Sequence, residues 1–243
     1  MVSLPPPPPD LLEGAALFLD FDGTLVELAD TPDSIRVPPD LDSLLERLRR
    51  RVRNRLAIVS GRSLADLDRH VRCAGLLVSG SHGVELRLSD GQALLVSVPE
   101  GLTGLRDEVT RFAQGTEGLI VEEKPAGIAL HYRLAPAEGE RALAFMTELG
   151  REHDLAVQQG KMVVELRPKG ADKGDALRAF MAEPAFAGAR PVFVGDDLTD
   201  EHAFEAATDL RGVGVLVGAE RATAARYRLA TVDAVSDWLS QAI

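Results

Sequence analysis

Short apolar runs alternate with amphipathic stretches in two parts of the chain. Residues 15–19 and 56–59 are apolar runs with the length of buried strands. Between them, leucines recur at helical spacing over residues 41–53, and Asp40 stands where a helix N-cap is expected. The same patterns predict further strands at 76–78, 191–194 and 212–217, and further helices from Leu64, at 172–181 and at 232–240. Strands that alternate with helices in this way are typical of an α/β fold, here a Rossmann-like doubly wound parallel sheet.

Residues 102–169 follow a different order. They contain a predicted helix at 102–112, two strands at 118–123 and 128–134, a second helix at 136–153, and two strands at 155–158 and 162–166. This αββαββ pattern predicts an α+β unit inserted into the βα domain. We therefore expect a core domain at 14–101 and 170–243 and a cap domain at 102–169. A hairpin is expected before the cap, with its turn at Ser89, Asp90 and Gly91.

The expected leader, residues 1–13, contains five consecutive prolines at positions 5–9. A run of this kind favours an extended polyproline conformation, and we expect the leader to be poorly ordered. Its residues lack the basic and apolar regions of a secretory signal. No apolar run in the sequence approaches the roughly 20 residues that a membrane-spanning helix requires.

Charge and cysteine content narrow the functional classes further. The 243 residues carry a formal net charge of -11 and contain no long basic run, which disfavours binding to nucleic acids or membrane surfaces. The single cysteine, Cys73, cannot form an intrachain disulfide and fits a reducing compartment. We expect a cytoplasmic protein.

Two carboxylates follow the first predicted strand directly. Asp20 and Asp22 lie on the same side of an extended chain, where their charges repel. A divalent cation could neutralise them, since hard oxygen ligands suit Mg²⁺. Alternatively, one could serve as a nucleophile and the other as a general acid. The ordinary structural explanation is a strand that ends in a turn at Asp22 and Gly23.

Three later segments of the sequence also carry polar side chains directly after a predicted strand or at the start of a predicted helix. Ser60 follows the second strand, Lys173 lies at the start of a helix, and an acidic loop follows the strand at 191–194. That loop contains Asp196, Asp197 and Asp200. Each group taken alone could be a helix N-cap or a solvated charge. In a parallel sheet, however, loops at the carboxyl ends of the strands line one crevice, so we expect these groups to converge.

The segment Asp-Phe-Asp-Gly-Thr at residues 20–24 resembles the DxDGT signature of the haloacid dehalogenase-like (HAD) phosphohydrolases, and the four positions match the HAD motifs in order and type. The resemblance implies that Asp20 attacks phosphorus to form an aspartyl phosphate. It implies that Asp22 protonates the leaving hydroxyl and then deprotonates the hydrolytic water.

The same resemblance assigns roles to the remaining groups of the core. Mg²⁺ would be held by Asp20, the main-chain carbonyl of Asp22, and Asp196. Asp197 and Asp200 would orient waters or the ammonium group of Lys173. Ser60 would donate a hydrogen bond to the transferring phosphoryl group, and Lys173 would neutralise its charge.

Within the predicted cap, polar residues cluster at the ends of strands. They are Glu122, Lys124, His131, Arg133 and Glu165. Carboxylates combined with cations are good partners for several hydroxyl groups, and hence for a sugar. For each residue a solvated sheet edge is an equally good explanation.

These cap residues, together with the segments at 80–85 and 195–201, resemble the trehalose-6-phosphate phosphatases, over nearly all of the chain past the leader. The resemblance implies hydrolysis of trehalose 6-phosphate, with Glu122, Lys124 and Glu165 at glucose hydroxyls. It also implies substrate contacts for the remaining candidates, which are Gly61, Arg62, His82, His131 and Arg133.

Two alternatives stay open at this point. Related cap-bearing enzymes act on sucrose phosphate or on glycosyl phosphoglycerates. A catalytically silent HAD domain could instead serve as the partner of a sugar-phosphate synthase, although every motif residue is present here. Functional coupling of an active phosphatase to a trehalose-6-phosphate synthase is a further implication of the resemblance.

Overall fold

The computed structural model describes residues 3–29, 34–72, 75–88, 91, 93–95, 101–170 and 172–243. Cys73 and two residues of the predicted turn, Ser89 and Asp90, lie outside the described residues. The chain forms two compact units. The first contains Met1–Ala29, Ile35–Leu94 and Asp172–Ile243, and the second contains Asp30–Ser34 and Leu95–Ala171. We call them the core and the cap. The predicted cap boundaries, 102–169, lie inside the second unit.

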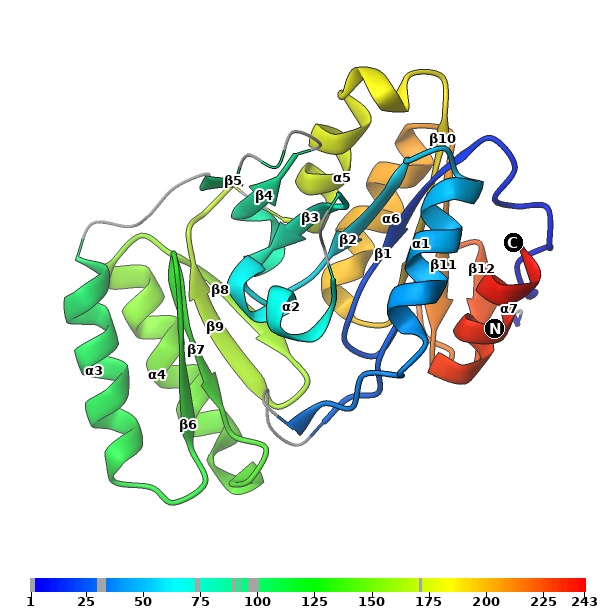
Figure 1. The fold of residues 1–243 in the computed structure, drawn as a ribbon. Helices are drawn as coiled ribbons and strands as arrows, with labels where there is room; N and C mark the ends of the chain where they lie inside the picture. Colours follow the sequence, from blue (N-terminus) through cyan, green and yellow to red (C-terminus); the bar gives the residue numbers. More distant parts are fainter. Residues whose placement is uncertain are drawn as a thin grey trace. The chain divides into compact units, whose positions relative to one another are not determined.

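The core is built on one eight-stranded sheet with the order β12-β11-β10-β1-β2-β3-β4-β5 (Figure 1). The pairs from β12 to β3 are parallel, and β4 pairs with β3 in the antiparallel direction. The strands are β1 (Ala15–Leu19), β2 (Leu56–Val59), β3 (Leu77–Gly80), β4 (Glu85–Arg87), β5 (Ala93–Leu95), β10 (Arg190–Gly195), β11 (Val213–Val217) and β12 (Tyr227–Leu229). The predicted doubly wound parallel sheet is confirmed.

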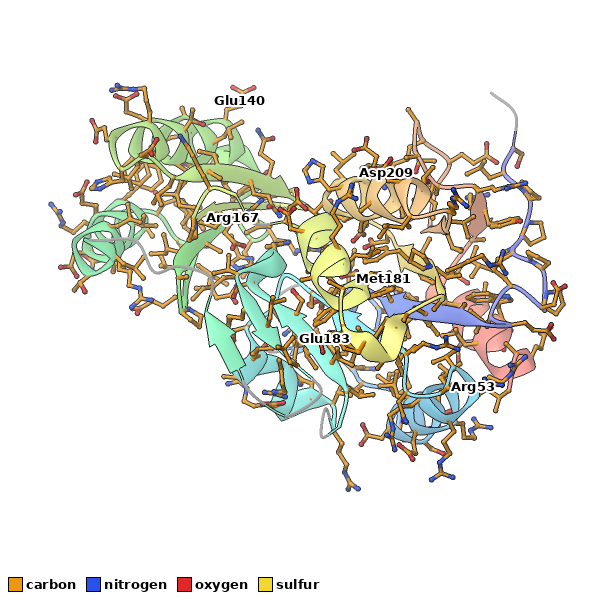
Figure 2. The ribbon with its side chains drawn as sticks, turned by 90° about the horizontal axis from the view of Figure 1, so that it is seen from above. Arg53, Glu140, Arg167, Met181, Glu183 and Asp209 are labelled. Atoms are coloured by element: carbon orange, nitrogen blue, oxygen red, sulfur yellow. The ribbon has the colours of Figure 1, made fainter. Side chains whose placement is uncertain are left out.

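Helices cover both faces of this sheet, as the continuous apolar strands require. On one face, Leu17 and Leu19 of β1 belong to a core that includes leucines of three helices. These helices are α1 (Leu41–Arg51), α2 (Leu64–His70) and α7 (Val232–Gln241). On the other face, Ala16 and Phe18 pack in a second core with α5 (Lys173–Met181) and α6 (Glu201–Asp209), whose last residues are labelled in Figure 2.

The proline leader is packed against the core, and the prediction that it is poorly ordered is wrong. The carbonyl of Pro5 accepts a hydrogen bond from the backbone N–H of Arg228 in β12, at 3.0 Å. The carbonyl of Pro8 accepts from Nε1 of Trp238 at 3.4 Å, and Pro7 is buried. Proline cannot donate a backbone hydrogen bond, but its carbonyl still accepts one. The leader therefore covers an edge strand whose N–H groups would otherwise be exposed.

The cap is a four-stranded antiparallel sheet with the order β6-β7-β9-β8, and it carries two helices. Its elements follow the predicted αββαββ order: α3 (Leu102–Gln114), β6 (Ile120–Lys124), β7 (Gly127–His131), α4 (Gly139–Glu152), β8 (Ala156–Gly160) and β9 (Val163–Arg167). Ile128, Leu130, Val164 and Leu166 face the helices and form the hydrophobic core of this unit.

Alternation along the strands places a different set of residues on the other face of the cap sheet. There the register aligns Glu122, Ala129, Glu165 and Gln158 in one row across the four strands. The polar side chains of Glu122 and Glu165 therefore lie on either side of Ala129, a small residue on β7.

None of the helices in the described part of the chain combines the length and the apolar character needed to cross a bilayer.

Candidate active site

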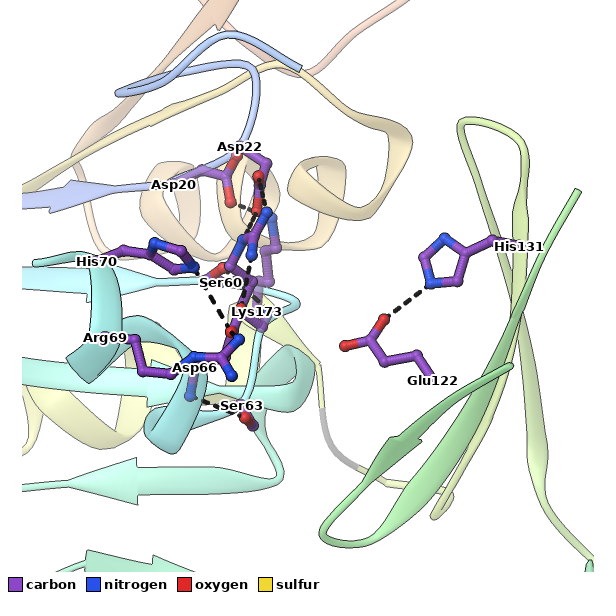
Figure 3. Close-up of polar contacts among 11 residues, drawn as sticks. Asp20, Asp22, Ser60, Ser63, Asp66, Arg69, His70, Glu122, His131 and Lys173 are labelled. Atoms are coloured by element: carbon purple, nitrogen blue, oxygen red, sulfur yellow. Dashed lines mark hydrogen bonds and ion pairs between the residues drawn. The ribbon is translucent and has the colours of Figure 1, made fainter. Parts of the chain in front are cut away.

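The ammonium group of Lys173 joins two acidic positions that lie far apart in the sequence. Nζ of Lys173 lies 2.7 Å from Oδ1 of Asp20, which follows β1, and 2.6 Å from Oδ1 of Asp200 (Figure 3 shows the first pair). All three side chains are less than 5% exposed. Burial alone would lower the pKa of Lys173, but the two carboxylates raise it above its ordinary value. Lys173 is therefore a fixed positive charge.

Asp20 is held in an environment that disfavours an isolated negative charge. Burial raises the pKa of its carboxyl group well above the ordinary value, Lys173 lowers it, and repulsion from Asp200 and Asp196 raises it further. A bound cation acts in the opposite direction, because it stabilises the ionised carboxylate.

The carboxylates of Asp20, Asp196 and Asp200 offer oxygen atoms that all lie within 4.8 Å of one another. Gly23 allows Asp196 to approach: it has a φ of +77°, and a Cβ at this position would lie 2.3 Å from Oδ2 of Asp196. Carboxylate oxygens are the donors that Mg²⁺ prefers, so the chemistry of this group fits such an ion.

Asp200 also has a structural role, which makes it the least available of the three for a metal. Its Oδ2 accepts a hydrogen bond from the N–H of Asp197 at 2.8 Å, while its Oδ1 accepts from Lys173. Asp197 in turn caps the turn through its Oδ1, which accepts from the N–H of Thr199. Asp197 and Asp200 were expected to orient waters or the ammonium group of Lys173; Asp200 contacts Lys173, and Asp197 stabilises the loop.

Ser60 is fully buried at the end of β2, where its Oγ accepts a hydrogen bond from the N–H of Arg62 at 3.1 Å. The imidazole of His82 lies directly above Gly61, since a Cβ on Gly61 would come within 2.5 Å of its ring atoms. His82 and Ser81 have φ values of 55° and 47°, in the left-handed region that non-glycine residues rarely adopt. Strain of this kind is common at functional sites.

Asp22 is paired with Arg62. Nε of Arg62 donates to Oδ2 of Asp22 at 2.7 Å, and Nη2 donates to Oδ1 at 2.9 Å. The remaining terminal nitrogen, Nη1, donates to Oδ2 of Asp66 at 2.6 Å. Although burial lowers the pKa of Arg62, these two carboxylates raise it above its ordinary value. The sequence predicted a substrate contact for Arg62 and gave Asp66 no role.

The cap candidates form two polar pairs on the face opposite the helices. Lys124 and Glu165 form a buried ion pair. Nε2 of His131 lies 2.8 Å from Oε2 of Glu122 (Figure 3). Burial raises the pKa of Glu122, but the contact with His131 and the charge of Lys124 lower it below its ordinary value.

Two arginines of the cap form hydrogen bonds with other residues of the cap. Arg133 donates to the main-chain carbonyl of Lys161 at 3.0 Å. Arg167, labelled in Figure 2, donates through Nε to Oε1 of Gln158 at 2.7 Å. Gln158 has no predicted role, although its two-residue alternation with Ala156 places it on the polar face.

Comparisons with known proteins identify the family of the chain. A family model described as trehalose-phosphatase matches residues 18–233. A probable trehalose-phosphate phosphatase of Sinorhizobium fredii is 40% identical over 210 residues, which cover 85% of this chain and 79% of that protein. The trehalose-6-phosphate phosphatase of Escherichia coli is 37% identical over 233 residues, which cover 95% of this chain and 87% of that protein.

Solved structures show the same fold. The C-terminal domain of the trehalose-6-phosphate phosphatase of C. albicans superposes with a TM-score of 0.86 at 24% identity, covering 98% of this chain and 97% of that one. A trehalose-6-phosphate phosphatase related protein superposes with a TM-score of 0.77 at 27% identity, covering 92% of this chain and 95% of that one.

Proposed function

The chain belongs to the trehalose-phosphatase family, and from this premise we propose that it hydrolyses trehalose 6-phosphate to trehalose and phosphate with the help of Mg²⁺. Its membership makes it a phosphoric monoester hydrolase, as the sequence predicted. The observation that supports the proposal most directly is the buried contact of Lys173 with Asp20 and Asp200. A carboxylate oxygen of Asp196 lies within 4.8 Å of a carboxylate oxygen of each of these two aspartates.

In the first step, a carboxylate oxygen of Asp20 attacks phosphorus, and the bond between phosphorus and the sugar oxygen breaks. Asp22 gives its proton to the departing sugar oxygen. In the second step, Asp22 takes a proton from a water molecule, whose oxygen attacks phosphorus. Phosphate leaves and Asp20 is restored as a carboxylate.

Two residues stabilise the charge of the transferring phosphoryl group. The hydroxyl of Ser60 accepts from Arg62, so its proton is available for donation to a phosphoryl oxygen. Lys173 supplies a positive charge that is already in place before the substrate binds, and such preorganised charge needs no rearrangement during the reaction.

Asp20, Asp196 and the main-chain carbonyl of Asp22 would hold Mg²⁺. When bound, the ion neutralises negative charge on the phosphoryl oxygens. Asp200 already bonds to Lys173 and Asp197, so we assign it to positioning Lys173.

We assign recognition of the sugar to the polar face of the cap, with Glu122, Lys124 and Glu165 at the hydroxyl groups. Their carboxylates and ammonium group are suitable partners for hydroxyls, which both donate and accept hydrogen bonds. Coupling to a trehalose-6-phosphate synthase belongs to the same proposal, because that enzyme would supply the substrate.

The experiment is a phosphate-release screen across trehalose 6-phosphate, sucrose 6-phosphate, glucose 6-phosphate and a glycosyl phosphoglycerate, each with Mg²⁺ and with EDTA. We expect the highest kcat/KM for trehalose 6-phosphate and no turnover in EDTA. Asp20→Asn is nearly isosteric and should fold but release no phosphate. A preference for another sugar phosphate would contradict the substrate assignment, and turnover by Asp20→Asn would contradict the mechanism.

A further inference from the structure

The bridging position of Arg62 suggests a role for a residue that no motif contains. We propose that Asp66 is a positioning residue for the reaction: it holds the guanidinium of Arg62, and through it the carboxyl group of Asp22, at the place from which Asp22 protonates the leaving oxygen. Both oxygens of Asp22 accept hydrogen bonds from Arg62 in the structure, so Asp22 exchanges one of these contacts for a proton before it acts as the acid. The inference rests on the proposed function, because it takes Asp22 as the general acid.

Arg62 is only 7% exposed and uses three of its nitrogens on two carboxylates. Nε and Nη2 form one edge of the planar guanidinium and contact both oxygens of Asp22. Nη1 contacts Asp66 at 2.6 Å. Its Cζ also lies 5.8 Å from the centre of the buried Phe21 ring. With these supports on separate sides, the guanidinium has a defined orientation, and so does the carboxylate bound to its edge.

Asp66 is itself fixed by the start of α2. Its N–H donates to Oγ of Ser63, the N-cap residue, at 3.1 Å, and its carboxylate also accepts from Nη2 of Arg69 at 2.5 Å (Figure 3). The Asp66 side chain is 14% exposed. Burial raises the pKa of Asp66, but Arg62 lowers it below the ordinary value, so the group is ionised at neutral pH.

A purely structural role for Asp66 makes a different prediction from a positioning role. Asp68 provides the comparison, because it lies on the same helix and forms a bidentate pair with Arg87, with distances of 2.8 and 2.6 Å. If Asp66 served only to stabilise α2, its removal would affect all substrates alike. If it positions the acid, its removal affects substrates in proportion to their need for a proton at the leaving oxygen.

Two aryl esters of nearly the same shape separate these possibilities. Phenolate is more basic than para-nitrophenolate, so phenyl phosphate needs protonation of the leaving oxygen and para-nitrophenyl phosphate needs little. The quantity to measure is kcat/KM with each ester, because it reports the first phosphoryl transfer. General acid catalysis contributes roughly 10²- to 10⁴-fold, so partial loss of orientation in Asp66→Asn should lower kcat/KM for phenyl phosphate about tenfold or more. The value for para-nitrophenyl phosphate should change by less than about threefold.

The control, Asp68→Asn, also removes one negative charge from α2. It should leave the ratio of kcat/KM for phenyl phosphate to kcat/KM for para-nitrophenyl phosphate unchanged. Arg62→Lys keeps a positive charge but cannot bridge both carboxylates, and it should shift the ratio in the same direction as Asp66→Asn. This variant decides the question if Asp66→Asn does not fold.

Asp22→Asn separates failure of this inference from failure of the proposed mechanism. A large selective loss in Asp22→Asn with an unchanged ratio in the folded Asp66→Asn variant would overturn the role of Asp66 and leave the mechanism intact. No selective loss in Asp22→Asn would overturn the assignment of the acid, and the inference with it.

Discussion

Lys173 and Asp20 are 153 positions apart in the sequence, yet Nζ of Lys173 lies 2.7 Å from Oδ1 of Asp20. The fold brings them together, because Asp20 directly follows β1 and α5 begins at Lys173. Both groups are buried, so the ion pair is only weakly screened by solvent and salt. It fixes the direction of the carboxylate that we assign as the nucleophile.

Replacement of Lys173 by methionine should damage both stability and activity. It leaves Asp20 and Asp200 buried without their cation, and breaking a buried ion pair costs about 3–5 kcal/mol. Burial already raises the pKa of Asp20, so the carboxyl group should take up a proton as the pH falls, and the deficit in unfolding free energy should shrink towards acidic pH.

Urea denaturation at several pH values measures this deficit. Lys169→Met is the control, because Lys169 is 59% exposed and pairs with the exposed Asp154. A surface pair of this kind contributes about 0–1 kcal/mol. A Lys173→Met protein as stable as the Lys169→Met protein at neutral pH would contradict the interpretation of the buried pair.

Metal binding should be visible in thermal unfolding, independently of turnover. A ligand that binds only the folded state stabilises it, by about 2.7 kcal/mol at a concentration 100 times its Kd. Mg²⁺ should therefore raise Tm of the wild-type protein, and Asp196→Ala should abolish the rise. Asp209→Ala is the control, since its carboxylate is exposed and pairs with Arg178. An equal rise in Tm for Asp196→Ala and wild type would place the ion elsewhere.

The sequence predicted the centre of the core sheet better than its edge. β1 and β2 have the predicted bounds, because central parallel strands are apolar throughout and stand out from the amphipathic helices. The edge strand β12 was missed. It has only three residues, with the charged Arg228 in the middle, and it depends on β11 and on the leader for its hydrogen bonds.

The roles of Arg62 and Asp66 show where sequence reasoning ends. Their spacing of four residues is typical of a helical ion pair and could have been noticed. The contact between Arg62 and Asp22, by contrast, spans 40 positions and exists only because β1 and β2 are neighbours in the sheet. A motif match names such residues but does not specify which pairs touch.

The Glu122–His131 pair should make cap stability depend on pH. The environment of Glu122 lowers the pKa of its carboxyl group in the folded protein. The pair therefore stabilises the fold at pH values above the pKa of Glu122 in the unfolded chain, which is about 4.3. This stabilisation is lost as the pH falls through the lower pKa of Glu122 in the folded protein. The difference in Tm between wild type and Glu122→Gln should therefore be largest near neutral pH and smallest below about pH 4. A difference that grows on acidification would contradict this sign.

The cap should recognise the sugar of the substrate, and the core should act on its phosphoryl group. Glu122→Ala, Lys124→Ala and Glu165→Ala should each impair hydrolysis of trehalose 6-phosphate but spare para-nitrophenyl phosphate, which presents no sugar hydroxyls. Each lost charge-assisted hydrogen bond should cost about 1.5–3 kcal/mol, or roughly 10- to 100-fold in kcat/KM. Lys173→Met should impair both substrates, because Lys173 acts on the phosphoryl group.

Glu123 supplies the matched control for these cap variants. It lies on the same strand as Glu122 and Lys124 but alternation directs it to the other face, where it is 63% exposed and lies 3.5 Å from Arg106. Glu123→Ala should therefore leave both activities within about twofold of wild type, because the side chain lies on the other face of the sheet and surface substitutions usually change the free energy of unfolding by no more than about 0.5 kcal/mol. Equal losses on both substrates in the three cap variants would mean that these residues maintain the structure of the cap. Unchanged activity on trehalose 6-phosphate in all three would mean that this face binds a different substrate, because a sugar held by these groups cannot lose them without a loss of affinity.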